Sequence, residues 1–247
     1  SVSIIPTAPK RSLILALGAI LGVFVGTALS LLLALRRGVY YSKESLKTGA
    51  QARITSSVKA ILPLRNKSLK DLNTILMKRP RNVLRDLAME IHKSDTSQVV
   101  VTSSRTKLTG NDIARALASY MQPETIKVAV IDFSSKTKKI NTDTERLSTG
   151  SFVVAETVGN VSVLIPGYDN AIMELLSKRD FIKNVQSLHS SIDLLFLCAD
   201  NGDAISLLRA LEGQKAFHIS HAKTKRTKSA TLIHMRSLLP IQGLLYD

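Results

Sequence analysis

The sequence predicts a mixed α/β protein in which one transmembrane helix precedes a mostly parallel sheet with helices on both of its faces. The first observation is that Ser12–Leu35 contains no charged residue and is rich in Leu, Ala, Gly and Val. The second is that short apolar or β-branched segments alternate with helical segments after residue 94, which is typical of a parallel sheet buried between helices. The third is that 45% of the 247 residues are hydrophobic and 21% are charged, which is too apolar for a disordered chain.

Residues 12–35 form the predicted membrane span, after an extended segment at residues 1–11. At about 1.5 Å per residue, a helix of this length covers roughly 36 Å, enough to cross the hydrocarbon core of a bilayer. A signal peptide is the rival interpretation, but its apolar core usually has only about 7–15 residues. Basic residues are more numerous after the span than before it, which favours a cytoplasmic C-terminal side under the positive-inside rule. They are Lys10 and Arg11 before the span and Arg36, Arg37, Lys43 and Lys47 after it.

Gly18, Gly22 and Gly26 recur at every fourth position within the span. This spacing places them near one helix face, where two helix backbones can approach closely and form an oligomer seam. Glycine is also common in membrane helices in general, so the same pattern arises without a packing role. From the sequence, both interpretations stay open.

Residues 36–93 are predicted to be a basic juxtamembrane linker that ends in an amphipathic helix. Basic side chains outnumber acidic ones in residues 64–93, and beside a bilayer each would be drawn to anionic headgroups by about 1 kcal/mol. A helix is predicted over residues 81–93 because its apolar residues recur at helical spacing. These residues are Leu84, Leu87, Ala88 and Ile91. A solvated surface is the favoured interpretation of this helix, whereas lipid attraction is favoured for the general excess of positive charge.

Residues 94–247 are predicted to fold as one α/β domain, for which about 150 residues are sufficient. The predicted strands are residues 98–102, 127–132, 161–165, 192–198, 215–220 and 241–245. The predicted helices are residues 111–120, 170–176, 179–189, 204–211 and 227–239. In such a sheet, ligands bind beyond the carboxyl ends of the strands.

The loop Ser103–Gly110 lies between a predicted strand and a predicted helix, where nucleotide-binding α/β proteins hold phosphate. A phosphate loop needs glycines, a Lys for the phosphate charge and a Ser or Thr for magnesium, but no Gly-Lys-Ser/Thr sequence occurs here. Its candidate residues are Ser103, Ser104, Lys107, Gly110 and Asn111. Asp112 adds a negative charge where a triphosphate would dock, which costs about 4 kcal/mol for charges about 4 Å apart at an effective dielectric constant of about 20. We therefore expect a degenerate phosphate loop that binds neither ATP nor magnesium.

Asp132 is the one carboxylate that the sequence keeps at a suitable strand end. One carboxylate is a poor magnesium site, so a strand-end or helix-cap role is favoured for it. Cys198 stands at the end of an apolar strand, where a metal-positioning Asp would be expected, and is interpreted as a small buried hydrophobic residue. The spacing of His218 and His221 directs their side chains to opposite faces of a strand. No catalytic or metal-binding residue is predicted.

Composition excludes some further classes of protein. One cysteine excludes a disulfide framework, and the absence of Trp with 4% aromatic residues argues against a stacking platform for single-stranded nucleic acid. The formal net charge of +15 nevertheless motivates a membrane-tethered nucleic-acid binder as a minor alternative, although no nucleic-acid partner is expected.

Several segments of the chain are similar to one family of bacterial membrane proteins. PTAPKRSLILALGAILG resembles a proline-rich lead-in and second membrane helix, and TSSRTKLTGNDIARALA resembles a phosphate (Walker A) loop with its helix. VAVIDFSSK and IDLLFLCAD stand at the Walker A-prime and Walker B strands, and VLIPGYDNAIMELLSKRDFIKNV is the most specific match. Over about Pro6–Asp247 the chain thus resembles the C-terminal part of a polysaccharide co-polymerase of the chain-length-determinant (Wzz) family, which carries a bacterial tyrosine kinase (BY-kinase) domain.

Two alignments of the loop with that family are open. In the simplest one, Lys107 and Thr109 replace loop glycines, Gly110 replaces the Walker Lys and Asn111 replaces its Ser/Thr. A shift by one residue places Gly110 on a glycine but puts Asn111 and Asp112 at the Lys and Ser/Thr positions. Neither alignment restores the phosphate site.

The resemblance implies a membrane-anchored, catalytically inactive kinase-like subunit in surface polysaccharide synthesis, chain-length control or export. Ser134 and Cys198 replace the second A-prime carboxylate and the Walker B carboxylate of the family, so no catalytic residue is carried over. The implied location is the bacterial inner membrane, with a single span in this chain and a cytoplasmic domain. The implied partners are membrane lipids, further copies of the chain, and a polysaccharide polymerase or export machinery. Because the chain begins at Ser1 directly before the span, we also expect a larger parent protein with a periplasmic N-terminal part.

An active ATP-dependent tyrosine kinase or ATPase with an atypical phosphate loop is the alternative function. It would use Lys107 as the loop cation, and only under this alternative are ATP and magnesium cofactors.

Overall fold

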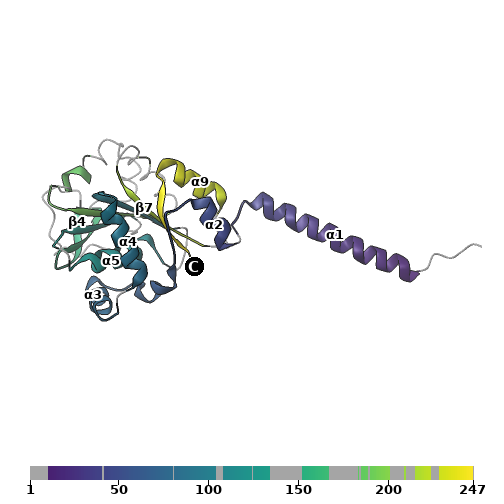
Figure 1. Ribbon diagram of the computed structural model, residues 1–247, viewed down its shortest axis with the longest axis horizontal. Helices are drawn as coiled ribbons and strands as arrows, with labels where there is room; N and C mark the ends of the chain where they lie inside the picture. Colours follow the sequence, from purple (N-terminus) through teal and green to yellow (C-terminus); the bar gives the residue numbers. More distant parts are fainter. Residues whose placement is uncertain are drawn as a thin grey trace, which may run out of the picture. The chain divides into compact units, whose positions relative to one another are not determined.

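The computed structural model describes residues 11–246, apart from residues 41, 80, 104–107, 124, 134–151, 167–182, 184, 189, 201–208, 210–214 and 224–227. The chain divides into two compact units, Ser1–Val39 and Tyr40–Asp247. The first contains the single long helix α1, and the second contains a sheet with helices around it (Figure 1).

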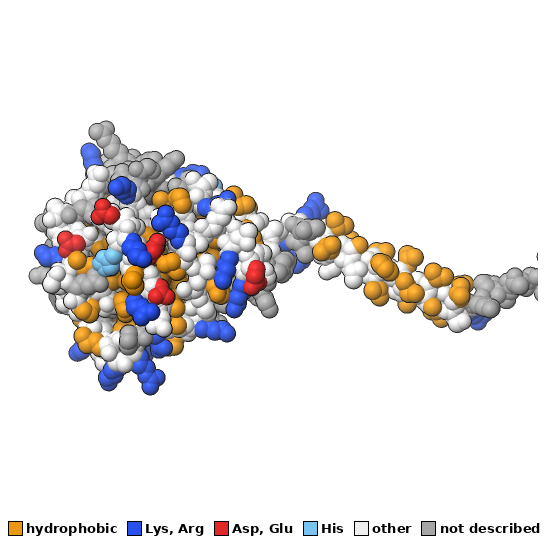
Figure 2. Space-filling model, viewed as in Figure 1, with side chains coloured by type: hydrophobic (Ala, Val, Ile, Leu, Met, Phe, Trp, Pro, Cys, Tyr) orange, Lys and Arg blue, Asp and Glu red, His pale blue; other side chains and the backbone are white. Residues whose placement is uncertain are grey.

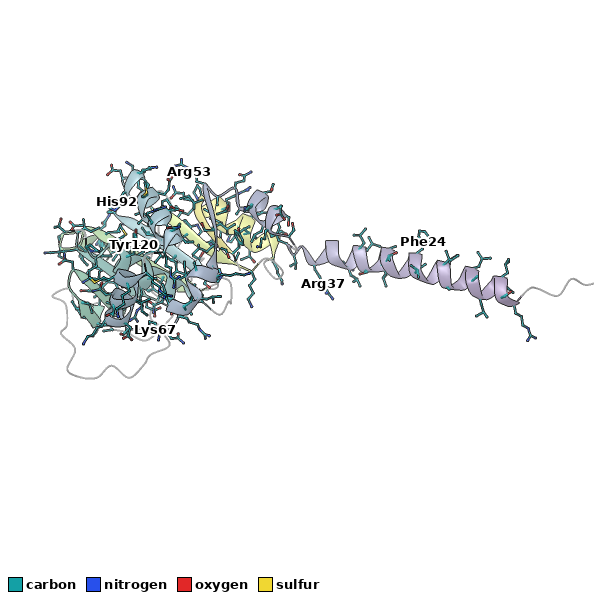
Figure 3. The ribbon with its side chains drawn as sticks, turned by 60° about the horizontal axis from the view of Figure 1, so that its bottom comes forward. Phe24, Arg37, Arg53, Lys67, His92 and Tyr120 are labelled. Carbon is teal, nitrogen blue, oxygen red and sulfur yellow. The ribbon has the colours of Figure 1, made fainter. Side chains whose placement is uncertain are left out.

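Helix α1 spans Arg11–Arg37 and confirms a helix over the predicted span. Its stretch Arg11–Leu33 is long and apolar enough to cross a membrane, judged by length and composition, and none of that stretch is buried. Side chains such as Phe24 project from it into open space (Figure 3). A Cβ atom added at any of its glycines would meet no heavy atom within 4 Å beyond the helix's own backbone, so the oligomer seam stays a prediction.

An eight-stranded sheet forms the centre of the second unit, in the order β1-β8-β7-β2-β6-β3-β5-β4. Every neighbouring pair is parallel except β4 with β5. The strands are β1 (Ile54–Ser57), β2 (Gln98–Ser103), β3 (Val128–Asp132), β4 (Phe152–Val158), β5 (Val161–Pro166), β6 (Leu194–Asp200), β7 (Phe217–Ala222) and β8 (Ile241–Tyr246).

Two hydrophobic cores lie on the two faces of this sheet, because successive strand residues point to opposite sides. Val99 and Val101 of β2 join a core that includes the inner faces of α3 (Leu69–Lys78), α4 (Asn82–Lys93) and α5 (Gly110–Met121). Val100 joins the core of the other face, which includes Met235 of α9 (Ser229–Leu238). A smaller cluster joins α2 (Lys43–Ala50) to α9 and β8. The fold is therefore the expected α/β arrangement with helices on both faces.

Most of the predicted elements in the described part of the chain are confirmed within about two residues at each end. The predicted strands correspond to β2, β3, β5, β6, β7 and β8. The predicted helices at residues 81–93, 111–120 and 227–239 correspond to α4, α5 and α9. The predicted helix at 170–176 lies outside the described residues, as do most of those at 179–189 and 204–211.

The predicted linker at residues 36–93 differs from the structure, because the second compact unit already begins at Tyr40. Helix α2, strand β1, the short 3-10 helices η1 (Val58–Ala60) and η2 (Leu62–Leu64) and helix α3 precede α4 within it. Strand β1 reads Ile-Thr-Ser-Ser, too short and polar to show a periodic signal, yet it pairs along β8 as the sheet's edge. The basic side chains of this stretch therefore stand on a folded surface rather than on a free linker.

Candidate functional site

The carboxyl ends of β2, β3, β6 and β7 meet at one edge of the sheet because these strands are parallel. Helix α5 begins beside this edge, and β2 lies between β6 and β7. This is the place where open parallel sheets bind their ligands. Several predicted site residues come together here, namely Ser103, Gly110, Asn111 and Asp132. Ser104 and Lys107 of the predicted loop lie outside the described residues.

Two side chains at the start of α5 accept hydrogen bonds from backbone N–H groups there. Thr109 is the residue that caps the helix, and its hydroxyl oxygen accepts the backbone N–H of Asp112 at 3.1 Å. In return, Asp112 Oδ2 accepts the backbone N–H of Thr109 at 2.9 Å and the Thr109 hydroxyl at 2.8 Å. This reciprocal pair, a capping box, satisfies N–H groups that a helix N-terminus otherwise offers to an anion.

The second carboxylate oxygen of Asp112 ties α5 to a distant segment of the chain. Asn66 donates its backbone N–H to Asp112 Oδ1 at 2.9 Å. The φ angle of Asn66 is 54°, in the left-handed region that asparagine adopts readily. Only 7% of Asp112 is exposed. Both oxygens of this carboxylate therefore serve donors of the protein itself, and its negative charge lies at the positive end of the α5 dipole.

Gly110 allows α5 to begin close against β2. A Cβ atom at this position would lie 2.9 Å from the carbonyl oxygen of Val101, closer than side chains tolerate. A lysine at position 110 would bring the same Cβ atom. The close start of α5 against β2 therefore depends on glycine at this position.

Asn111 faces the one carboxylate that sequence reasoning kept as a metal candidate. Its side-chain Nδ2 donates to Asp132 Oδ2 at 2.8 Å, and its Oδ1 is buried without a hydrogen-bond partner among the described residues. Asp132 is 7% exposed at the end of β3, in register with the buried Cys198 of β6. Within the described residues, no group of three or more His, Cys, Asp or Glu side chains is placed to hold a metal ion.

A buried histidine beside this edge was not recognised from the sequence as a structural link. His218 Nδ1 lies 3.2 Å from the carbonyl oxygen of Leu239, and Nε2 lies 3.1 Å from Thr102 Oγ1. Because a carbonyl only accepts, Nδ1 carries the proton and Nε2 accepts from the Thr102 hydroxyl. Burial lowers the pKa of His218 to about 4, against a smaller raising effect of the Leu239 hydrogen bond, so the ring is neutral near pH 7.

His221 has a different role from His218, in keeping with their placement on opposite faces of β7. Its Nδ1 lies 3.3 Å from the carbonyl oxygen of Leu108, and the Ser103 hydroxyl donates to the same oxygen at 3.0 Å. The end of β2 and the residue that follows the loop are thereby joined. Ser103 thus has a structural partner at the base of the loop.

Two solved structures share the fold of this chain. The BceF tyrosine kinase domain superposes with a TM-score of 0.58 at 12% sequence identity, covering 85% of this chain and 98% of that one. The chimerical protein CapA2B2 superposes with a TM-score of 0.55 at 14% identity, covering 83% of this chain and 98% of the other. No protein-family model and no curated protein sequence matches the chain. At these identities the likeness shows the fold alone, which is the α/β fold of the BceF tyrosine kinase domain.

Proposed function

We propose that this protein is a membrane-anchored subunit whose kinase-like domain works without nucleotide in the synthesis, chain-length control or export of a bacterial surface polysaccharide. Helix α1 anchors it in the inner membrane, and the α/β domain lies on the cytoplasmic side. There the domain acts as a docking module within a homo-oligomer and contacts a polymerase or export machinery. The polysaccharide role is supported by the resemblance of the sequence to the chain-length-determinant family, and the kinase-like domain is supported by the fold shared with BceF.

The observation that carries the loss of nucleotide binding is the use of the Asp112 carboxylate at the start of α5. In a phosphate-binding α/β protein this helix end offers N–H groups and a positive dipole to the nucleotide. Here the carboxylate accepts from Thr109 and Asn66 and holds a negative charge at that end. A phosphate would have to displace these bonds and would meet a like charge, which costs about 4 kcal/mol at about 4 Å and an effective dielectric constant of about 20.

The residues that could hold a magnesium ion also support the proposed loss of nucleotide binding. Magnesium takes oxygen ligands and stays close to octahedral. Asp132 offers one carboxylate, but its Oδ2 is engaged by the Asn111 amide. On the neighbouring strand β6, Cys198 stands at the register position of Asp132, two residues before the strand ends at Asp200. Across this pair of strands, Asp132 is therefore matched by a thiol rather than by a second carboxylate.

Titration of the full chain with magnesium-ATP tests the proposed loss of nucleotide binding. The protein is reconstituted in nanodiscs and followed by isothermal calorimetry, with the tyrosine kinase domain of BceF as the positive control. We expect no saturable heat up to about 1 mM nucleotide, whereas a dissociation constant of about 10 µM would overturn the proposal.

A cellular experiment tests the polysaccharide role separately. Deletion of the gene should change the length distribution of a surface polysaccharide on gels, and the wild-type chain should restore it. The Lys107→Ala variant should restore it equally well, since the proposed role needs no loop cation. Failure of this variant, at wild-type abundance in the membrane, would favour the active kinase. An unchanged polysaccharide after deletion would overturn the polysaccharide role.

A further inference from the structure

Helix α3 and the turn before it carry a cluster of exposed basic side chains. We call it the α3 basic surface; its members are Arg65, Lys67, Lys70, Lys78 and Arg79, together with Met77. Figure 2 shows blue side chains along the lower edge of the second unit, where Figure 1 places α3. Lys67 projects outward there in Figure 3.

The basic residues of this surface have no acidic partner among the described residues. Elsewhere in the described part of the unit, ion pairs join Arg53 to Glu90 at 3.6 Å, Arg85 to Asp86 at 3.6 Å, and Arg115 to Glu156. On α3 itself, Asp71 is the acidic residue. The surface therefore keeps an unbalanced positive charge, unlike the neighbouring surface of α4, where acidic and basic side chains pair.

The helix dipole favours Lys78 in the last turn of α3, but it does not explain Lys67 and Lys70 at the start of the helix. The inner face of α3 is held by the buried Leu69, Leu72 and Leu76, and the Leu69 backbone N–H donates to Glu156 Oε1 at 2.6 Å. Cations near the start of a helix oppose its dipole, so Lys67 and Lys70 stand where a positive charge lowers helix stability. Their placement is therefore not explained by the stability of α3.

An apolar side chain stands among the cations. Met77 is 71% exposed, and helical spacing places it on the same side of α3 as Lys70 and Thr74, next to Lys78. A surface that combines basic side chains with an exposed apolar one fits the interface of an anionic bilayer, where cations bind headgroups and the apolar group enters the acyl boundary. A nucleic acid would use the charge but gives Met77 no comparable partner.

We infer that the α3 basic surface docks the second unit on anionic lipid headgroups of the membrane in which α1 is anchored. This inference rests on the membrane anchoring in the proposed function. Only Gly38 and Val39 separate the end of α1 from the second unit, so anchoring of α1 keeps that unit beside the bilayer. Each lysine near an anionic surface strengthens the contact by about fivefold.

A fluorophore on a Met77→Cys variant of the full chain measures this docking. The chain's own cysteine, Cys198, is buried, so labelling is directed to position 77. The protein is reconstituted in nanodiscs of phosphatidylcholine alone or mixed with phosphatidylglycerol. We expect a blue-shifted emission and protection from acrylamide quenching only with phosphatidylglycerol. About 1 M salt should reverse both, because the screening length then falls to about 3 Å.

Charge variants with a matched control separate this surface from net charge. Lys70→Gln with Lys78→Gln should lower the ratio of docked to undocked protein by about thirtyfold. Lys59→Gln with Lys93→Gln removes the same charge from exposed positions outside the α3 basic surface and should leave the ratio unchanged. An equal loss in both double variants would overturn the assignment of docking to this surface.

The remaining outcomes also decide the matter. If the fluorescence of the label is the same in both lipid compositions, in a protein that has inserted correctly, the docking would be overturned and the anchoring would stand. A chain that enters neither nanodisc would overturn the anchoring and the docking together. A label that responds to added duplex DNA but not to phosphatidylglycerol would assign the surface to nucleic acid instead. Loss of nucleotide binding is measured separately, so none of these results bears on it.

Discussion

Asn111 and Asp132 are joined by a hydrogen bond of 2.8 Å from Nδ2 to Oδ2, which links the first turn of α5 to the end of β3. The two residues stand at the edge of the sheet where the parallel strands end, which is where open α/β sheets bind their ligands. The hydrogen bond between them lies within the chain. The site is stabilised by contacts within the chain, and this property can be measured by unfolding.

Asn111→Ala should lower the free energy of unfolding of the second unit by about 1–3 kcal/mol, because the nearly buried Asp132 carboxylate loses a donor. Tyrosine fluorescence during urea unfolding measures this, since all five tyrosines lie between residues 40 and 247. Asn82→Ala is the matched control, at an exposed position in the first turn of α4. Equal stabilities of the two variants would show that the bond contributes nothing.

Asp112→Asn should destabilise the protein by about 1–2 kcal/mol, although the two side chains have nearly the same shape. Both oxygens of Asp112 accept hydrogen bonds, whereas an asparagine offers one oxygen and turns an NH2 group toward a donor. Asp71→Asn is the control, since Asp71 holds the same place after the α3 cap residue but is exposed. Thermal unfolding in detergent should separate the two variants, and equal midpoints would contradict this account.

The fold could be predicted because its central segments carry strong patterns. The apolar runs of β2 and β6 and the helical spacing in α4 and α5 persist in the structure. Strand β1 could not be predicted, since four largely polar residues become a strand only by pairing with β8, far away in the sequence. Strand β4 was not predicted for a related reason. It is an antiparallel edge strand, and its residues after Val153 are only partly buried or exposed.

The site was predictable in part. The residue types alone show that the loop lacks a Gly-Lys-Ser/Thr sequence. The spacing of Thr109 and Asp112 is a capping signal that could have located the start of α5. The Asn66 contact joins residues 46 positions apart, and the link from His218 to Thr102 joins residues 116 positions apart. Such long-range hydrogen bonds leave no local pattern, so only the folded chain shows them.

Gly110→Ala should destabilise the protein by about 1–3 kcal/mol, because the added Cβ atom would crowd the Val101 carbonyl oxygen at 2.9 Å. The sign is diagnostic, since the same change inside an unconstrained helix stabilises by about 1 kcal/mol. Gly22→Ala, in the open helix α1, should leave the tyrosine-detected unfolding unchanged. A gain in stability for the first variant would mean that α5 does not begin as close to β2 as the structure places it.

His218 should make the stability of the second unit depend on pH. Its pKa is lowered to about 4 in the folded chain, against 6.5 as its ordinary value, so between these values the unfolded chain binds more protons. The contribution of the neutral His218 to the free energy of unfolding is complete above pH 6.5 and falls by up to about 3 kcal/mol as the pH drops toward 4. His218→Gln should flatten that part of the curve, because a neutral amide can donate to Leu239 and accept from Thr102 without titrating. Urea unfolding at a series of pH values compares the two slopes, and parallel curves would contradict the role assigned to the buried ring.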